Sequence, residues 1–350
     1  MMGIRIKAAT AAVAAGLLAL TACGSTAGTG SSDDGTTLRI SGFSVLGQAN
    51  VPVFKAFQAT PAGKGVRFQT SYGASGDQSR AVDAGQKADV VHYSLETDVT
   101  RLVKSNLVSA DWNKTPTKGI ATSSVVVLVV RKGNPKHITG WDDLAKPGIK
   151  IITPDPGSSG SARWNILGAW AHITGNGGSE ADAKAYLTKV LKNTIALPGS
   201  GREATTAFTS GSGDVLISYE DEAIEAKQAG DDIDYIVPSD TLRIDNPAAV
   251  TVGANPKAKD FLNFMTSAQG QKIYAQEGFR PVISGVDVGQ VKGANNPSDP
   301  FPQPKQLFTI DQNFGGWSKA ADKYFGDGQN GDPLGIITAL QKSTGKVGSN

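Results

Sequence analysis

The sequence predicts an α/β fold built from two lobes. Short apolar runs alternate with segments whose apolar residues recur at helical spacing, and this alternation is typical of a parallel sheet covered by helices. Turns rich in Gly and Ser stand at three places where an apolar run ends and a helical pattern begins. The nearly unbroken β-branched run at 123–131 separates the first of these turns from the other two. Such a run is typical of a strand that is buried on both faces or that passes between lobes.

The elements expected along the chain follow this alternation. Strands are predicted at residues 38–43, 66–70, 88–93, 123–131, 149–152, 194–197, 214–218, 235–237 and 250–252. Helices are predicted at residues 51–57, 96–104, 162–173, 180–191, 220–228, 258–265 and 269–276, and after the turns at 73–76 and 199–201. Proline-rich connections follow Arg280. The turns at strand-to-helix junctions therefore lie where α/β sheets bind their ligands.

The stretch at 153–165, TPDPGSSGSARWN, carries the strongest of these turns. Pro154 and Pro156 end the strand, and Ile166, Leu167 and Trp170 then recur at helical spacing. The first N–H groups of a helix have no internal partner and carry the positive end of its dipole, so small residues leave them open to an anion. We interpret this turn as half of an oxyanion clamp. An ordinary helix cap of Ser and Gly is the alternative.

The same pattern occurs at 73–76 and at 199–201. Each of the three turns is followed, within about the first helical turn, by an arginine: Arg80, Arg163 and Arg202. A cation at this end of a helix is disfavoured unless negative charge lies nearby. The repeated arginines therefore favour an anion site over simple capping.

Residues 1–23 are typical of a bacterial export signal. Arg5 and Lys7 precede an apolar run at 8–20 that is too short to span a bilayer. The Leu-Thr-Ala-Cys sequence ending at Cys23 resembles a lipobox, and lipidation is the one role that uses the single cysteine of the chain. A plain secretory signal is the alternative. Residues 24–37, rich in Gly, Ser, Thr and Asp, are predicted to form a flexible tether.

The net charge and the length of the chain bear on its partners and on its number of domains. The net charge of +2 and the 19% of charged residues leave no basic stripe of the kind that binds nucleic acid, so no nucleic-acid partner is expected. The chain after the tether is long enough for two domains of medium size.

Several segments resemble the sulfate-binding proteins of bacterial ABC transporters, in the same order along almost the whole mature chain. They are residues 71–78, 129–136, 141–144, 153–165, 213–217, 279–281, 307–311 and 314–317. This resemblance implies a type II periplasmic-binding-protein fold, with two Rossmann-like lobes around a ligand cleft. Residues 38–123 and 243–350 would form the first lobe and residues 124–242 the second. The chain would cross between lobes near 123–127 and return near 239–245.

The resemblance also implies a sulfate site without metal or cofactor. It implies backbone N–H donors at Ser75, Gly160, Ser161 and Gly201, and one more from the turn next to Phe43. Ser159 would donate its hydroxyl. Tyr219 stands where the family has a Trp that donates its indole N–H. Arg163 and Arg202 would brace the turns behind the anion. The protein would act at the extracytoplasmic face of the bacterial membrane, held by its lipid anchor, and would deliver sulfate to permease and ATPase subunits.

Two alternatives stay open at this point. The same fold could be tuned to thiosulfate, molybdate or tungstate. A serine hydrolase is the alternative from another class, with Ser75 or Ser159 as nucleophile. The sequence has no G-x-S-x-G elbow and no Walker-type phosphate loop, and His92, His137 and His172 are scattered without metal-ligand spacing. A binding protein, and not an enzyme, is therefore expected.

Overall fold

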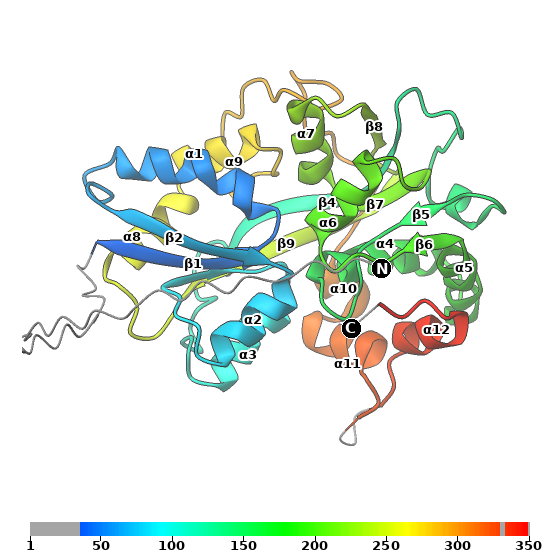
Figure 1. Ribbon diagram of the computed structural model, residues 1–350, viewed down its shortest axis with the longest axis horizontal. Coiled ribbons are helices and arrows are strands. Elements are labelled where there is room, and N and C mark those ends of the chain that lie inside the picture. The colour runs from blue at the N-terminus through cyan, green and yellow to red at the C-terminus, as the bar shows by residue number, and fades with distance from the viewer. Residues whose placement is uncertain (1–35, 330–332, 349–350) are drawn as a thin grey trace, which may run out of the picture. The chain divides into compact units, whose positions relative to one another are not determined.

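The computed structural model describes residues 36–329 and 333–348. The predicted export signal at 1–23, the lipidation site Cys23 and nearly all of the tether at 24–37 lie outside these residues. The described chain from Thr37 onward forms an α/β fold with helices on both faces of one sheet (Figure 1).

The described part of the chain contributes ten strands to this sheet. They are β1 (Thr37–Phe43), β2 (Arg67–Gly73), β3 (Val90–His92), β4 (Ile120–Arg131), β5 (Ile151–Ile152), β6 (Thr194–Ala196), β7 (Val215–Tyr219), β8 (Ile233–Ile236), β9 (Asp240–Val250) and β10 (Gln306–Phe308). Their order is β2-β1-β3-β9-β4-β7-β5-β6, with β10 paired to β9 and β8 paired to β4. We call β2, β1 and β3 the first half-sheet, and β7, β5 and β6 the second.

Strands β4 and β9 join the two half-sheets. They pair antiparallel, with Ser123 opposite Asp245, because β4 carries the chain from the first half-sheet to the second and β9 brings it back. The strand pairs within each half-sheet are parallel, as the alternation of strands and helices predicts. The sheet as a whole is therefore mixed and not wholly parallel.

The helices cover both faces of each half-sheet. The first half-sheet is flanked by α1 (Leu46–Gln58), α2 (Ser75–Asp83), α3 (Glu96–Lys104), α8 (Lys257–Met265) and α9 (Ala268–Gln276). The second is flanked by α4 (Gly160–Gly175), α5 (Glu180–Asn193), α6 (Gly201–Thr209) and α7 (Glu220–Ala229), with a short 3₁₀ helix at Trp141–Ala145. Figure 1 shows α6 and α7 on one face of the second half-sheet and α4 and α5 on the other.

The long β-branched run shows why the sheet is covered on both sides. In β4, Val126 and Leu128 belong to one apolar cluster, while Val125, Val127 and Val129 belong to another on the opposite face. Side chains alternate between faces along a strand, so a continuous apolar run supplies both cores at once. Burial of each such side chain contributes about 2 kcal/mol.

The C-terminal helices were not foreseen from the sequence. Helices α10 (Ile310–Phe314), α11 (Trp317–Phe325) and α12 (Ile336–Thr344) follow β10, and α12 packs against α5. The Trp317 ring packs edge-on against Trp164 with centroids 4.6 Å apart, and Tyr324 packs against Trp170 at 5.2 Å. These aromatic contacts pack α11 against α4. The division into lobes at 38–123 with 243–350 and at 124–242 stays a prediction.

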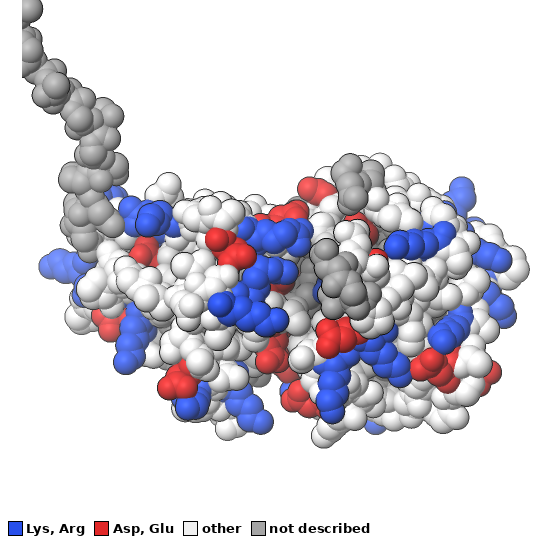
Figure 2. All heavy atoms as spheres, turned by 90° about the horizontal axis from the view of Figure 1, so that it is seen from below, with Lys and Arg blue, Asp and Glu red and all other residues white. Residues whose placement is uncertain are grey.

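None of the described helices is long and apolar enough to cross a bilayer. On the face drawn in Figure 2, Lys and Arg are interspersed with Asp and Glu and do not form one basic patch.

Candidate functional site

A small cavity lies where four helices begin. Residues in or next to the starts of α1, α2, α4 and α6 line it, together with the ends of β1, β2 and the turn after β3. The lining residues are small or apolar and are Phe43, Ser44, Val45, Gly73, Ala74, Ser75, Ser94, Ser159, Gly160, Ser161 and Gly201. The cavity encloses about 200 Å³ of space, part of it open to solvent, which suits an ion of a few atoms better than a large organic ligand.

Backbone N–H groups are the main donors that this cavity offers. In the described part of the chain, the N–H groups of Ser75, Gly160, Ser161 and Gly201 have no hydrogen-bond acceptor. They stand at the first positions of α2, α4 and α6, where helical geometry leaves N–H groups unpaired and the helix dipole is positive. The convergence of several helix starts therefore favours a bound anion.

The serine before α4 does not behave as an ordinary cap. Ser200, before α6, accepts a hydrogen bond of 3.3 Å from the Glu203 N–H in the usual way. Ser159 stands at the equivalent position of α4, but among the described residues its hydroxyl pairs with the Ser161 hydroxyl at 2.8 Å and makes no capping bond. One of these two hydroxyl protons is used between them, so the other remains available to a ligand.

The hydroxyl of Ser75 is fully used inside the protein. It donates to Asp98 Oδ2 over 2.6 Å and accepts from the Ser94 N–H over 2.9 Å. A carboxylate oxygen only accepts, so the direction of the first bond is fixed. Ser75 can therefore serve a ligand only through its backbone N–H, which is the role that the sequence predicts.

Two glycines line the cavity at positions without space for a side chain. A Cβ on Gly160 would lie 2.7 Å from Ser94 Oγ and 2.8 Å from Leu95. A Cβ on Gly201 would lie 2.9 Å from Ser161 Oγ and 3.0 Å from a carboxylate oxygen of Glu222. These glycines let the backbones of α4 and α6 approach the cavity closely.

No charged side chain belongs to the lining in the described residues. Asp77, next to the α2 turn, is paired with Arg80 at the surface, and neither Asp155 nor Glu203 is among the lining residues. A carboxylate is thus missing from the described wall.

The chain is similar to bacterial solute-binding proteins. A model of the bacterial extracellular solute-binding protein family matches residues 38–280. The sulfate-binding protein of Synechococcus elongatus is 41% identical over 286 residues, which cover 79% of this chain and 79% of the relative. The chain belongs to the sulfate-binding protein family. The solved structure of the sulfate-binding protein SubI from Mycobacterium tuberculosis superposes with a TM-score of 0.78 at 43% identity, and the match covers 83% of this chain and 99% of that one.

Not all similar members of the family are named for the same anion. The thiosulfate-binding protein of Pseudomonas aeruginosa is 32% identical over 294 residues, covering 79% of this chain and 84% of the relative.

The two arginines assigned to bracing lie outside the cavity lining. Arg163 donates from Nε to the Pro156 carbonyl over 3.0 Å and lies over the Phe325 ring at 4.9 Å, and burial lowers its pKa. Arg202 forms an ion pair with the buried Glu225. Both contacts tie the start of a helix to its surroundings, and the bracing role of the two arginines stays a prediction.

Tyr219 is placed differently from the other predicted ligands. It ends β7, is fully buried, and its hydroxyl lies 2.6 Å from Ser94 Oγ. Burial raises its pKa well above 10, so the phenol keeps its proton. Tyr219 is absent from the described lining, whereas Ser94 is part of it. Direct contact between Tyr219 and a ligand stays a prediction.

Ser44 and Val45 belong to the turn expected next to Phe43, but Ser94, which also lines the cavity, was missed from the sequence. Ser94 follows β3 and precedes α3, so it stands at a strand-to-helix junction like the predicted turns. The strand-to-helix junction was therefore visible in the sequence as a possible site. The residues around Ser94 include no glycine, however, and did not match the Gly/Ser pattern.

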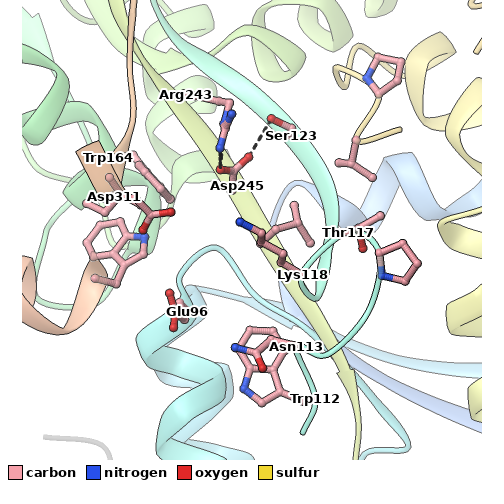
Figure 3. Close-up of a pocket in the computed structure, with 16 residues that line it drawn as sticks. Glu96, Trp112, Asn113, Thr117, Lys118, Ser123, Trp164, Arg243, Asp245 and Asp311 are labelled. Atoms are coloured by element: carbon pink, nitrogen blue, oxygen red, sulfur yellow. Dashed lines mark hydrogen bonds and ion pairs between the residues drawn. The ribbon is translucent and has the colours of Figure 1, made fainter. Parts of the chain in front are cut away.

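A larger pocket of about 1310 Å³, also partly open to solvent, lies near the crossing strands. Its wall combines charges of both signs with aromatic rings. Figure 3 shows Arg243 and Ser123 both bonded to Asp245, at 2.8 Å and 3.2 Å, and Glu96 and Asp311 on other parts of the wall. Carboxylates at this density would repel an anion, so the pocket is a poorer oxyanion site than the small cavity.

The histidines offer no base to the cavity serines. His92 Nε2 lies 3.1 Å from Thr122 Oγ1, and burial lowers the His92 pKa to about 3. His172 lies between Asp240, at 2.7 Å, and Asp142, at 3.2 Å. Within the described ranges, no group of three His, Cys, Asp or Glu side chains could hold a metal ion.

Proposed function

We propose that this protein binds sulfate in the small cavity and delivers it to an ABC transporter for import. The observation that carries the proposal is the convergence of unpaired N–H groups from α2, α4 and α6 on a cavity with no charged side chain in its described lining. Membership of the sulfate-binding protein family supports it. The hydrolase alternative has no support, because the family consists of solute-binding proteins.

The proposed donors are divided between the two sides of the cavity. Ser75 and the turn at Phe43 donate N–H groups from the first half-sheet. Gly160, Ser161 and Gly201 donate N–H groups from helices beside the second, and Ser159 donates its hydroxyl.

The number of hydrogen-bond donors determines the affinity expected for sulfate. Burial of a dianion costs several kcal/mol per charge, but each hydrogen bond to a charged group contributes about 1.5–3 kcal/mol. Five to seven donors therefore contribute on the order of 10 kcal/mol, which corresponds to roughly micromolar binding or tighter.

The same donor set favours sulfate over phosphate. Hydrogen phosphate carries a proton at neutral pH that needs an acceptor, whereas sulfate carries none. In a cavity whose described wall has no carboxylate, that proton would be left without a strong acceptor. Thiosulfate also has no proton, so this argument does not separate it from sulfate, and thiosulfate is the second candidate ligand.

The proposed location is the outer face of the cell membrane. Members of this family act outside the cytoplasm. We propose that Cys23 carries the lipid that holds the protein there, with residues 24–37 as the tether. Permease and ATPase subunits of an ABC transporter are the proposed partners.

A thermal-shift panel tests the proposed function. A ligand that binds only the native state raises the melting temperature with concentration, by an amount set by its affinity. Sulfate and thiosulfate should raise it at micromolar to millimolar concentrations, molybdate less, and phosphate and chloride little. If neither sulfate nor thiosulfate raised it at 10 mM, on the order of ten thousand times the proposed dissociation constant, the proposed function would be wrong.

A further inference from the structure

A chain of buried hydrogen bonds leads from His92 to the cavity wall. His92 Nε2 lies 3.1 Å from Thr122 Oγ1, and the Thr122 hydroxyl donates to Asn246 Oδ1 over 3.2 Å. Because Asn246 receives that bond at its oxygen, its amide nitrogen faces the opposite way. That nitrogen donates to the Ser94 carbonyl over 3.3 Å, so the chain of bonds ends on a residue that lines the cavity.

The chain has a fixed direction at its end. Tyr219 is fully buried, and among the described residues its hydroxyl hydrogen-bonds Ser94 Oγ. A buried hydroxyl proton needs an acceptor, so the Tyr219 proton is directed to Ser94 Oγ, 2.6 Å away. Ser94 Oγ accepts that proton and keeps its own. Since the Ser94 N–H is already paired with Ser75 Oγ and the Ser94 carbonyl with Trp164 Nε1, only the hydroxyl proton is left to serve the cavity.

The position of Ser94 allows this proton to reach a ligand. Ser94 belongs to the cavity lining and is 1% exposed. Its Oγ lies so close to Gly160 that a Cβ there would be only 2.7 Å from it, and Gly160 is one of the proposed N–H donors.

We infer that Ser94 is a further hydroxyl donor to the bound oxyanion, and that Tyr219 is a positioning residue that acts through Ser94 and does not touch the ligand itself. This inference rests on the proposed function of the cavity. Aligned hydrogen bonds polarise one another in a buried site, so the bond from Tyr219 strengthens the Ser94 hydroxyl as a donor. The chain is made of neutral groups, because burial keeps His92 unprotonated.

A double-mutant cycle on the full chain tests this inference, with sulfate as the probe and calorimetric dissociation constants as the readout. Ser94→Ala should weaken binding about ten- to a hundredfold, the effect of one lost charge-assisted bond. Tyr219→Phe removes only the phenol oxygen and should weaken binding about three- to tenfold, since Ser94 keeps its hydroxyl but loses its orientation. In the Ser94→Ala background, Tyr219→Phe should have no further effect.

Other outcomes have definite meanings. If the two substitutions multiply, so that Tyr219→Phe has its full effect without Ser94, Tyr219 contacts the ligand directly and the inference is wrong. If Ser94→Ala binds like wild type, Ser94 is not a donor. Melting temperatures without ligand show whether each variant is folded. General destabilisation would lower these temperatures, but it would not make the effect of Tyr219→Phe on affinity depend on the presence of Ser94. A wild-type protein that binds neither sulfate nor thiosulfate would overturn the proposed function itself, which separates the two failures.

Discussion

The backbone N–H of Gly76 donates a hydrogen bond of 3.2 Å to the carbonyl oxygen of Ser158. Gly76 is the second residue of α2, beside the first half-sheet, and Ser158 lies just before α4, beside the second. A second bond, from Trp164 Nε1 to the Ser94 carbonyl at 2.8 Å, joins the same two sides. We expect both bonds to form when the two sides close on a ligand and to break when they separate, because a ligand that contacts both sides stabilises the closed arrangement.

Gly160→Ala should interfere with this closure. Its added methyl group would lie 2.7 Å from Ser94 Oγ, which belongs to the other side of the cavity. Overpacking of this kind costs about 1–3 kcal/mol, so sulfate affinity should fall about five- to a hundredfold while the unliganded melting temperature changes little. Gly140→Ala is the matched control, since a Cβ at Gly140 meets no described atom within 4 Å. Equal affinities of the Gly160 variant and wild type would show that the close approach is unnecessary for binding.

Ser159→Ala should weaken sulfate binding by about 1.5–3 kcal/mol, or ten- to a hundredfold, because one charge-assisted hydrogen bond is lost. Isothermal calorimetry measures this directly. Ser267→Ala is the control: Ser267 caps α9 by accepting from the Gly270 N–H at 3.2 Å, far along the chain from the cavity residues. That control should lose about 1 kcal/mol of stability and keep its affinity. Unchanged affinity in the Ser159 variant would remove its hydroxyl from the site.

The stability of the protein should decline in acid partly because of His92. Burial lowers the His92 pKa from 6.5 to about 3. Between these values the unfolded chain binds a proton that the folded protein excludes, so this contribution is present above pH 6.5 and is lost as the pH falls. The loss should be on the order of 2 kcal/mol by pH 4.5.

Urea unfolding at pH 7.5 and pH 4.5 measures this loss, with His92→Asn as the comparison. The variant has no group that titrates at this position, so its free energy of unfolding should fall less between the two pH values. An equal fall in variant and wild type would mean that His92 does not stay neutral in the folded protein.

Cys23→Ala should release the mature protein from the membrane. Cys23 is the only cysteine in the chain and ends the lipobox-like sequence. Fractionation of cells that express the variant should find it in the soluble extracytoplasmic fraction, while wild type stays with the membrane. A variant that still fractionates as an integral lipoprotein would exclude Cys23 as the anchor.

Sequence patterns located most of the fold because local chemistry dictates it. The helix expected at 96–104 is α3 to the residue, and the strand expected at 123–131 is β4 with three more residues at its start. The strand expected at 250–252 shares only Val250 with β9, since Asp245, Asn246 and Pro247 interrupt the apolar pattern of β9. These residues are tolerated because pairing with β4 supplies hydrogen-bond partners to the backbone of β9. This pairing is a tertiary contact, which a local sequence pattern does not reveal.

The sequence indicated those parts of the candidate site that consist of backbone N–H groups at helix starts. Glycine and serine turns before helices indicated Ser75, Gly160 and Gly201, and the structure gathers them around one cavity. Ser94 and the relation between Ser94 and Tyr219 were not predictable, because the two residues are 125 positions apart and meet only in the folded chain.

The most direct measurement is a calorimetric titration of the wild-type protein, first dialysed free of sulfate, with sulfate and with phosphate at pH 8. Five to seven donors and no carboxylate in the described wall predict one sulfate per chain, with a dissociation constant of about 1 μM or lower. They predict phosphate binding at least about a hundredfold weaker, because its proton has no strong acceptor. Phosphate binding as tight as sulfate, or no saturable heat with sulfate at millimolar concentration, would contradict a sulfate site built from donors alone.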